Sequence, residues 1–113
     1  GRVVLDDHAR VLKLLVKRHR DLGRLKNKAA CRLHALLMEL EPGGMVKGMS
    51  VTRANEILDR IEPTTQMTEH RLAVARETLA DIVHYETQMK ASMKRLRTAV
   101  AASGTSLILR GTR

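Results

Sequence analysis

The fold is decided by residues 5–40, which read LDDHARVLKLLVKRHRDLGRLKNKAACRLHALLMEL. Apolar side chains recur here in steps of three and four residues, the spacing that places them on one face of an α-helix. In a seven-residue repeat, the first position (a) holds Leu5, Leu12, His19, Lys26, Leu33 and Leu40, and the fourth (d) holds His8, Leu15, Leu22, Ala29 and Leu36. A repeat sustained over several heptads predicts a long helix that packs against another.

A second heptad stretch lies near the other end of the chain. Its a positions are Leu72, Leu79, Glu86, Met93 and Val100, and its d positions are Ala75, Ile82, Met89 and Leu96. The two stretches are similar in length and a compact connection joins them, so we expect them to fold back antiparallel. The predicted fold class is all-α, a long coiled-coil-like antiparallel hairpin with a short helix at the turn. Its seam is expected to hold Leu12, Leu15, Leu22, Leu33, Leu36, Leu72, Leu79, Ile82, Met89 and Leu96.

Residues that begin and end helices divide the chain into three parts. We expect an N-terminal lead-in over 1–5, the helical hairpin over 6–104 and an unstructured tail over 105–113. Within the hairpin, helices are predicted at about 6–40, 52–61 and 65–102. The residues suited to begin or end them are Asp6 and Asp7, Ser50 or Thr52, Thr64 or Thr65, and Gly104.

Two charged residues occupy seam positions near the middle of the hairpin. Matching the lengths of the antiparallel helices places Glu86 roughly level with Lys26. An opposite-charge pair inside a seam fixes the register, because a shift of the helices would leave both charges without partners. We predict that Lys26 and Glu86 form a register pair.

Apolar residues also lie beside the seam, at Val11, Val16, Leu25, Leu37, Val83 and Tyr85. A two-helix hairpin cannot bury so wide an apolar stripe. We therefore expect a second copy of the chain, or the rest of a parent protein, to cover it.

The charge balance points to a polyanionic partner. The 113 residues include 21 Lys and Arg against 12 Asp and Glu, a formal net charge of +9. Cations that neutralise phosphates release counterions, which favours binding to nucleic acid. Aromatic residues make up 1% of the chain, which disfavours modules that stack single-stranded bases. Duplex DNA or structured RNA fits the composition better.

One face of the first predicted helix carries Arg10, Lys13, Lys17, Arg20, Arg24 and Lys28. A solvated face is the alternative interpretation, but solvated faces normally mix signs, and only Asp21 interrupts this one. A second basic group, Lys90, Lys94, Arg95 and Arg97, falls level with Arg10–Lys17 in an antiparallel hairpin. We predict that both groups contact phosphates, which position a nucleic acid without reading its sequence.

The sequence holds no pattern typical of a catalytic or metal site. Cys31 and His34 are three residues apart, but two ligands without a third do not make a metal site, and Cys31 is interpreted as a small buried residue. We expect no catalytic residue, no metal, no cofactor and no small-molecule ligand. A single cysteine favours a reducing compartment, and no apolar run approaches the ~18 residues of a membrane span.

Three stretches carry a resemblance to a known family: LKLLVKRHRDL at 12–22, RLHALLMELEPGG at 32–44 and AVAASGTSL at 99–107. In this order and spacing they resemble the middle region of bacterial DEDD-type insertion-sequence transposases, the insertion-sequence one-ten family, over about residues 6–107. The resemblance implies a helical segment between an RNase-H-like domain and a domain with a serine nucleophile. In the family this segment contributes to dimerisation and to gripping nucleic acid, including a guide RNA.

Neither catalytic part of that family lies in this chain, so the resemblance transfers no catalytic residue. After Leu107 the chain also departs from the family's Gly-rich continuation, as expected of a trimmed chain or a gene remnant. We expect a cytoplasmic bacterial protein, the dimerisation and nucleic-acid-contacting region of a transposase. Its expected partners are duplex DNA or structured RNA, and a second copy or other transposase domains. The alternatives are a free-standing basic helical DNA- or RNA-binding or regulatory protein, and a purely structural coiled-coil module.

Overall fold

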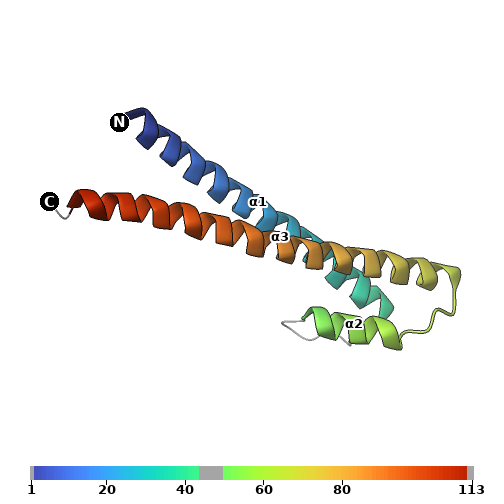
Figure 1. The fold of residues 1–113 in the computed structure, drawn as a ribbon. Coiled ribbons are helices and arrows are strands. Elements are labelled where there is room, and N and C mark those ends of the chain that lie inside the picture. Colours follow the sequence, from blue (N-terminus) through green and yellow to red (C-terminus); the bar gives the residue numbers. More distant parts are fainter. Residues whose placement is uncertain (1, 44–49, 112–113) are drawn as a thin grey trace. The chain divides into compact units, whose positions relative to one another are not determined.

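The computed structural model describes the backbone of residues 2–43 and 50–111, and the side chains of 7–43 and 50–102. These residues form three helices and no strand: α1 (Arg2–Leu40), α2 (Val51–Arg60) and α3 (Gln66–Gly111) (Figure 1). The two long helices run antiparallel and pack together, and the short α2 lies at the turn. The predicted all-α hairpin is therefore confirmed.

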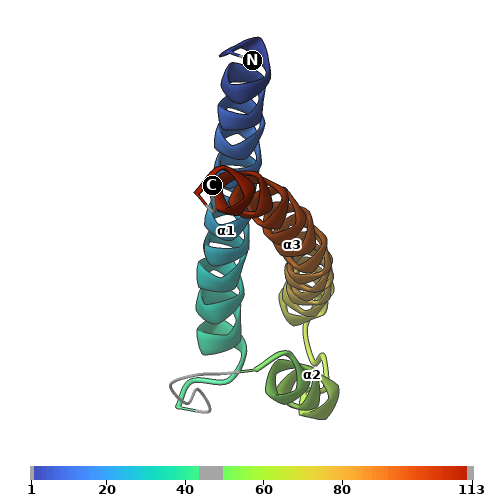
Figure 2. The ribbon, with the colours of Figure 1, turned by 60° about the vertical axis from the view of Figure 1, so that its left-hand side comes forward.

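The contacts between residues divide the chain into two units. Unit 1 comprises Gly1–Arg24 and Thr87–Arg113, and unit 2 comprises Leu25–Glu86. Each long helix contributes one part to each unit, whereas α2 belongs wholly to unit 2. Figure 2 shows α2 at the turn end of the hairpin, beside the end of α1 and the beginning of α3.

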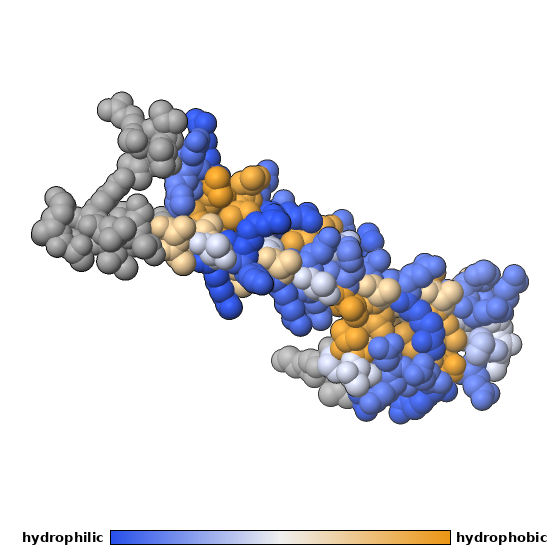
Figure 3. All heavy atoms as spheres, viewed as in Figure 1, coloured by the Kyte–Doolittle hydropathy of each residue, from blue (hydrophilic) through white to orange (hydrophobic). Residues whose placement is uncertain are grey.

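The main hydrophobic core lies in unit 2, where all three helices meet. In α2, the apolar residues Val51, Ala54, Ile57 and Leu58 recur at the spacing of one helix face. Ile57 and Leu58 are 1% and 0% exposed. The buried residues of this core are Ala29, Leu33, Leu37, Ala54, Ile57, Leu58, Leu72, Ala75, Leu79 and Ile82. Figure 3 shows apolar side chains gathered where α2 lies against α3.

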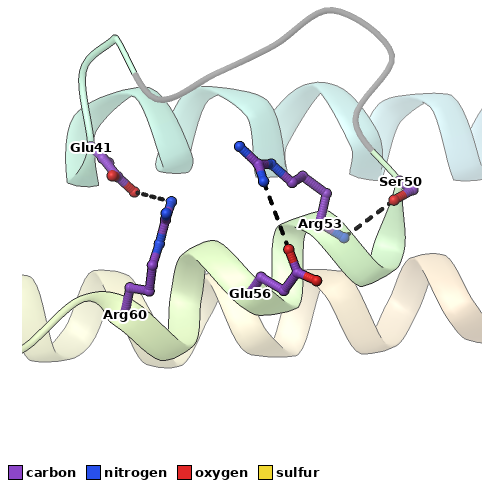
Figure 4. A network of polar contacts seen from close by, with 5 residues as sticks. All are labelled: Glu41, Ser50, Arg53, Glu56 and Arg60. Carbon is purple, nitrogen blue, oxygen red and sulfur yellow. Dashed lines mark hydrogen bonds and ion pairs between the residues drawn. The ribbon is translucent and has the colours of Figure 1, made fainter.

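Short-range polar contacts fix both ends of α2. The Ser50 hydroxyl accepts a hydrogen bond from the backbone N–H of Arg53 at 3.2 Å, so Ser50 rather than Thr52 caps the helix. Near the other end, the Arg60 guanidinium lies 3.5 Å from the Glu41 carboxylate, which ties α2 to the end of α1 (Figure 4). The first turn of α3 is capped similarly, because the Thr65 hydroxyl accepts from the Thr68 N–H at 3.1 Å.

Both long helices extend further than the sequence indicated. α1 begins at Arg2 and α3 ends at Gly111, so the expected lead-in is wrong over residues 2–5 and the unstructured tail is wrong over 105–111. Gly104 does not end the helix, because one glycine costs a helix only about 1 kcal/mol and no proline follows it. Asp6 and Asp7 lie past the first turn of α1. Gly1, residues 44–49 of the predicted loop, and residues 112–113 lie outside the described residues.

The seam follows the heptads in part. Leu15, Leu22, Leu33, Leu72, Leu79 and Ile82 are buried, whereas Leu12, Leu36, Met89 and Leu96 are half-buried. Two positions depart from the pattern. Leu37, expected beside the seam, is 1% exposed and replaces Leu36 in the core, because α2 packs on that side of α1. Val100, expected at a seam position, is 55% exposed, while its neighbour Ala99 is half-buried.

We predict that Leu58→Ala destabilises the protein by about 2–5 kcal/mol, because it leaves a cavity where three helices meet. The matched control is Met67→Ala, since Met67 is 59% exposed at the start of α3. It should change the free energy of unfolding by less than about 0.5 kcal/mol. Urea unfolding followed by circular dichroism at 222 nm measures both. Equal effects of the two substitutions would show that α2 does not close the core.

Gly23 in α1 offers a stabilising substitution in unit 1. A Cβ atom at this position would lie 3.7 Å from the Met89 methyl group, an ordinary contact distance, and the backbone has no positive φ. Gly23→Ala should therefore stabilise the chain by about 0.5–1 kcal/mol through the higher helix propensity of alanine. Thermal unfolding measures the change. A destabilised variant would mean that α1 and α3 approach more closely at this point.

Candidate nucleic-acid interface

Positive charge is concentrated in one of the two units. Unit 1 contains 13 of the Lys and Arg residues but only 3 of the Asp and Glu residues. Unit 2 contains the other 8 cations together with 9 acids, so it is nearly neutral. Unit 1 therefore carries a formal charge of +10 and unit 2 a charge of −1, which together give the net charge of +9. The sequence prediction placed both basic groups at the end away from the turn, and the division into units adds that unit 2 is nearly neutral.

The predicted phosphate-contacting residues are all exposed to solvent. Nine of the ten belong to unit 1: Arg10, Lys13, Lys17, Arg20 and Arg24 on α1, and Lys90, Lys94, Arg95 and Arg97 on α3. Lys28 belongs to unit 2. The structure also adds Arg18, an exposed cation of unit 1. The sequence prediction missed it because it follows Lys17 directly and so lies about 100° around the helix from the basic face.

The two units differ in how their cations are paired. In unit 2, carboxylates lie within 4 Å of Lys26, Arg53, Arg60, Arg71 and Arg76. Among the described side chains of unit 1, an ion pair forms only between Arg24 and Asp21, at 3.8 Å. Both of its side chains are largely exposed, so the pair contributes little. The other described cations of unit 1 thus face solvent without a carboxylate partner.

This arrangement creates a positive field over unit 1. On α1, neighbouring cations of the basic face are three or four residues apart, so their side chains project side by side. The α3 segment from Thr87 to Arg113 contains no acidic residue at all. At physiological ionic strength charges act over a distance of roughly 8 Å, which is enough for adjacent cations to reinforce one another. A polyanion that approaches unit 1 therefore meets several cations together.

Apolar surface lies beside these cations. Val11, Leu14 and Val16 are 46%, 66% and 39% exposed. A shallow hollow of about 350 Å³ is lined by Ala9, Leu12 and Val16, with Arg10 and Lys13 at its edge. Figure 3 shows this part of α1 as apolar side chains open to solvent among charged ones. The apolar stripe that the sequence predicted beside the seam is thus uncovered at Val11 and Val16 within this chain.

The predicted register pair is present in unit 2. The Lys26 ammonium lies 3.5 Å from the Glu86 carboxylate, with the two side chains 36% and 38% exposed. The pair borders a pocket of about 560 Å³ whose walls include Leu33, Leu37 and Ile82. Both charges therefore remain in contact with water, which limits the cost of placing them at seam positions.

The described residues contain no group of three or more His, Cys, Asp or Glu side chains arranged to hold a metal ion. Cys31 is exposed, so its interpretation as a buried residue was wrong. The residue type is usually buried, but here it lies on the solvent side of α1, away from the core residues Ala29 and Leu33. No helix in the described part of the chain combines the length and apolar character that a membrane span needs.

Comparison of the sequence with protein-family models and with curated proteins, and of the structure with solved structures, finds no match.

We predict a small but measurable coupling between Lys26 and Glu86. A double-mutant cycle of Lys26→Met and Glu86→Gln should give about 0.2–1 kcal/mol, the range of solvent-exposed ion pairs. The coupling should shrink in 1 M NaCl because salt screens the pair. Urea unfolding of the four proteins measures it. Zero coupling at low salt would mean that this pair does not set the register of the hairpin.

Proposed function

We propose that this chain is a nucleic-acid-contacting helical region that grips the phosphate backbone with unit 1. The observation that carries the proposal is the set of exposed cations on unit 1 without carboxylate partners, in contrast to unit 2, whose cations are mostly paired. A chain under selection only for solubility gains from mixed signs on both units. A unit that carries charge of one sign, as unit 1 does, favours the binding of a polyanion.

The surface fits a duplex or structured RNA better than extended single strands. Single-strand platforms stack bases on aromatic side chains. The only aromatic side chain of the Phe, Tyr or Trp type is Tyr85, and it lies half-buried against the core of unit 2, whereas the excess of cations belongs to unit 1. Cations spread along two helices instead match phosphates that recur along a backbone. Such contacts give affinity and position but little sequence preference.

We further propose that the chain acts within a transposase that resembles the insertion-sequence one-ten family. The support is the resemblance of residues 12–22, 32–44 and 99–107, together with the agreement between the helical linker of that family and the helical hairpin of this chain. In this setting the chain contributes dimerisation and nucleic-acid contact, and chemistry belongs to other domains. The exposed Val11, Leu14 and Val16 support a role in association, because they leave apolar surface for a second copy or a neighbouring domain.

The proposal predicts salt-sensitive binding that depends on the cations of unit 1. The test variant combines Arg10→Gln, Lys13→Gln and Lys17→Gln, and the matched control combines Arg53→Gln, Arg60→Gln and Arg71→Gln in unit 2. Both variants remove three positive charges, so net charge alone cannot distinguish them. Fluorescence anisotropy with labelled duplex DNA and with structured RNA, at a series of salt concentrations, measures the affinity.

We expect the test variant to bind at least about tenfold less tightly than the parent. The slope of log affinity against log salt should become shallower by about 0.9 for each phosphate that the variant no longer neutralises. The control should remain within about threefold. If the two variants bound equally weakly, the loss of affinity would follow from net charge alone. That result would contradict the proposal that unit 1 carries the binding surface. No binding even at low salt would leave an oligomerisation module, and a preference for RNA would favour the guided-transposase setting.

A further inference from the structure

The two helices of unit 1 make a thin contact. In this unit only Leu15 and Leu22 of α1 are buried among the described apolar side chains. None of the described α3 residues at 87–102 is buried, and the apolar ones facing α1, such as Met89 and Leu96, are half-buried. Unit 2, by contrast, has a core of ten buried residues from three helices. Among the described side chains, apolar packing therefore holds unit 1 together much less firmly than unit 2.

Two contacts join α1 and α3 within the described part of unit 1. Nδ1 of His19 lies 3.2 Å from the Ser92 hydroxyl, and Gly23 faces Met89. Val100 and Ala101, toward the end of the described side chains of α3, are exposed.

The two helical arms of unit 1 also repel each other. The α1 arm, Gly1–Arg24, carries seven cations and three acids, and the α3 arm, Thr87–Arg113, carries six cations and no acid. Where the two helices pack, near the contact of His19 with Ser92, axes about 8–10 Å apart bring the arms within the range of charge interactions at moderate ionic strength. No described carboxylate of one arm pairs with a cation of the other. Folding thus brings two positive arms together around a thin apolar contact.

We propose that the nucleic-acid backbone is a structural component of unit 1. Without it, the two arms separate from each other while unit 2 stays folded. When phosphates lie against the cations of both arms, they neutralise the repulsion and hold the arms together. This inference rests on the proposed function, and it adds that binding and the closing of unit 1 are one coupled event.

Coupling between nucleic-acid binding and the closing of unit 1 predicts a change in the free protein that a rigid basic surface would not show. Neutralising one cation on each arm, as in the double variant Lys13→Gln/Lys94→Gln, removes repulsion in the free protein and removes phosphate-binding groups in the complex. The variant should therefore show a more protected unit 1 when free and a lower affinity for duplex DNA. On a rigid surface the same substitutions would weaken binding and leave the protection of the free protein unchanged.

Hydrogen exchange of the full chain, followed by mass spectrometry, tests the proposal directly. We compare peptides from residues 7–24 and 87–102 with peptides from 51–60 and 66–86. At about 20 mM salt without nucleic acid, unit 1 should exchange at least about tenfold faster than unit 2. Adding 0.5 M NaCl should slow exchange in unit 1, because screening weakens the repulsion. Adding duplex DNA at low salt should slow exchange in unit 1 more than NaCl does.

In the absence of DNA, amide hydrogens of unit 1 should exchange more slowly in the double variant Lys13→Gln/Lys94→Gln than in the parent protein. The matched control is Arg53→Gln/Arg71→Gln, which removes two paired cations of unit 2 and should leave unit 1 unchanged. Anisotropy on the same samples reports binding separately. Binding without a change in unit 1 exchange overturns this inference and leaves the proposed function standing. Absence of binding overturns both. Equal exchange of the two units at low salt without DNA overturns the inference whatever the affinity.

Discussion

Ile57 and Leu58 of α2 pack between α1 and α3 with almost none of their surface exposed, and the hairpin depends on this contact. A helix of ten residues is not stable alone in water, so α2 exists because this packing stabilises it. Ser50 caps the start of α2 and Thr65 caps the start of α3. Because the connections to α2 are short, the end of α1 and the beginning of α3 lie close together. The antiparallel arrangement of the two long helices follows from that constraint.

A firm core in unit 2 allows unit 1 to carry charge that does not favour folding. Arg71 and Arg76 of unit 2 each lie beside a carboxylate of another helix. Arg60 lies beside Glu41, which directly follows α1, so these charges favour the fold. In unit 1 the described cations of α1 and α3 face solvent without a carboxylate partner on another helix, and they lie on helices that must pack together. Residues that lower the stability of the fold around them are expected at functional surfaces. The unpaired cations described in unit 1 therefore point to a function, whereas the paired charges of unit 2 are explained by their ion pairs within the fold.

The sequence predicted the helices and their pairing because heptad spacing reports which residues share a helix face. It did not predict the exchange of Leu36 for Leu37 in the core, because that depends on where a third helix packs. The end of α3 was misplaced because Gly104 ends a helix only where the chain also turns, and here the backbone continues as helix to Gly111. For the candidate site, spacing predicted which cations are exposed and that both basic groups lie away from the turn. It did not predict the ion pairs of Arg60, Arg71 and Arg76 in unit 2. A periodic pattern along α1 cannot show that its basic face crosses from one unit into the other.

The charge segregation also bears on how copies of the chain associate. A purely structural coiled coil draws specificity from opposite charges beside its seam. The α3 arm of unit 1 has no acid to offer, so that interpretation leaves its cations unexplained. Association of two copies through Val11 and Leu14 of unit 1 would bring two strongly positive surfaces together. Such an interface becomes favourable when a polyanion neutralises the cations around it. If two copies associated through unit 1, their association and nucleic-acid binding would depend on each other, whereas association through the nearly neutral unit 2 would need no nucleic acid.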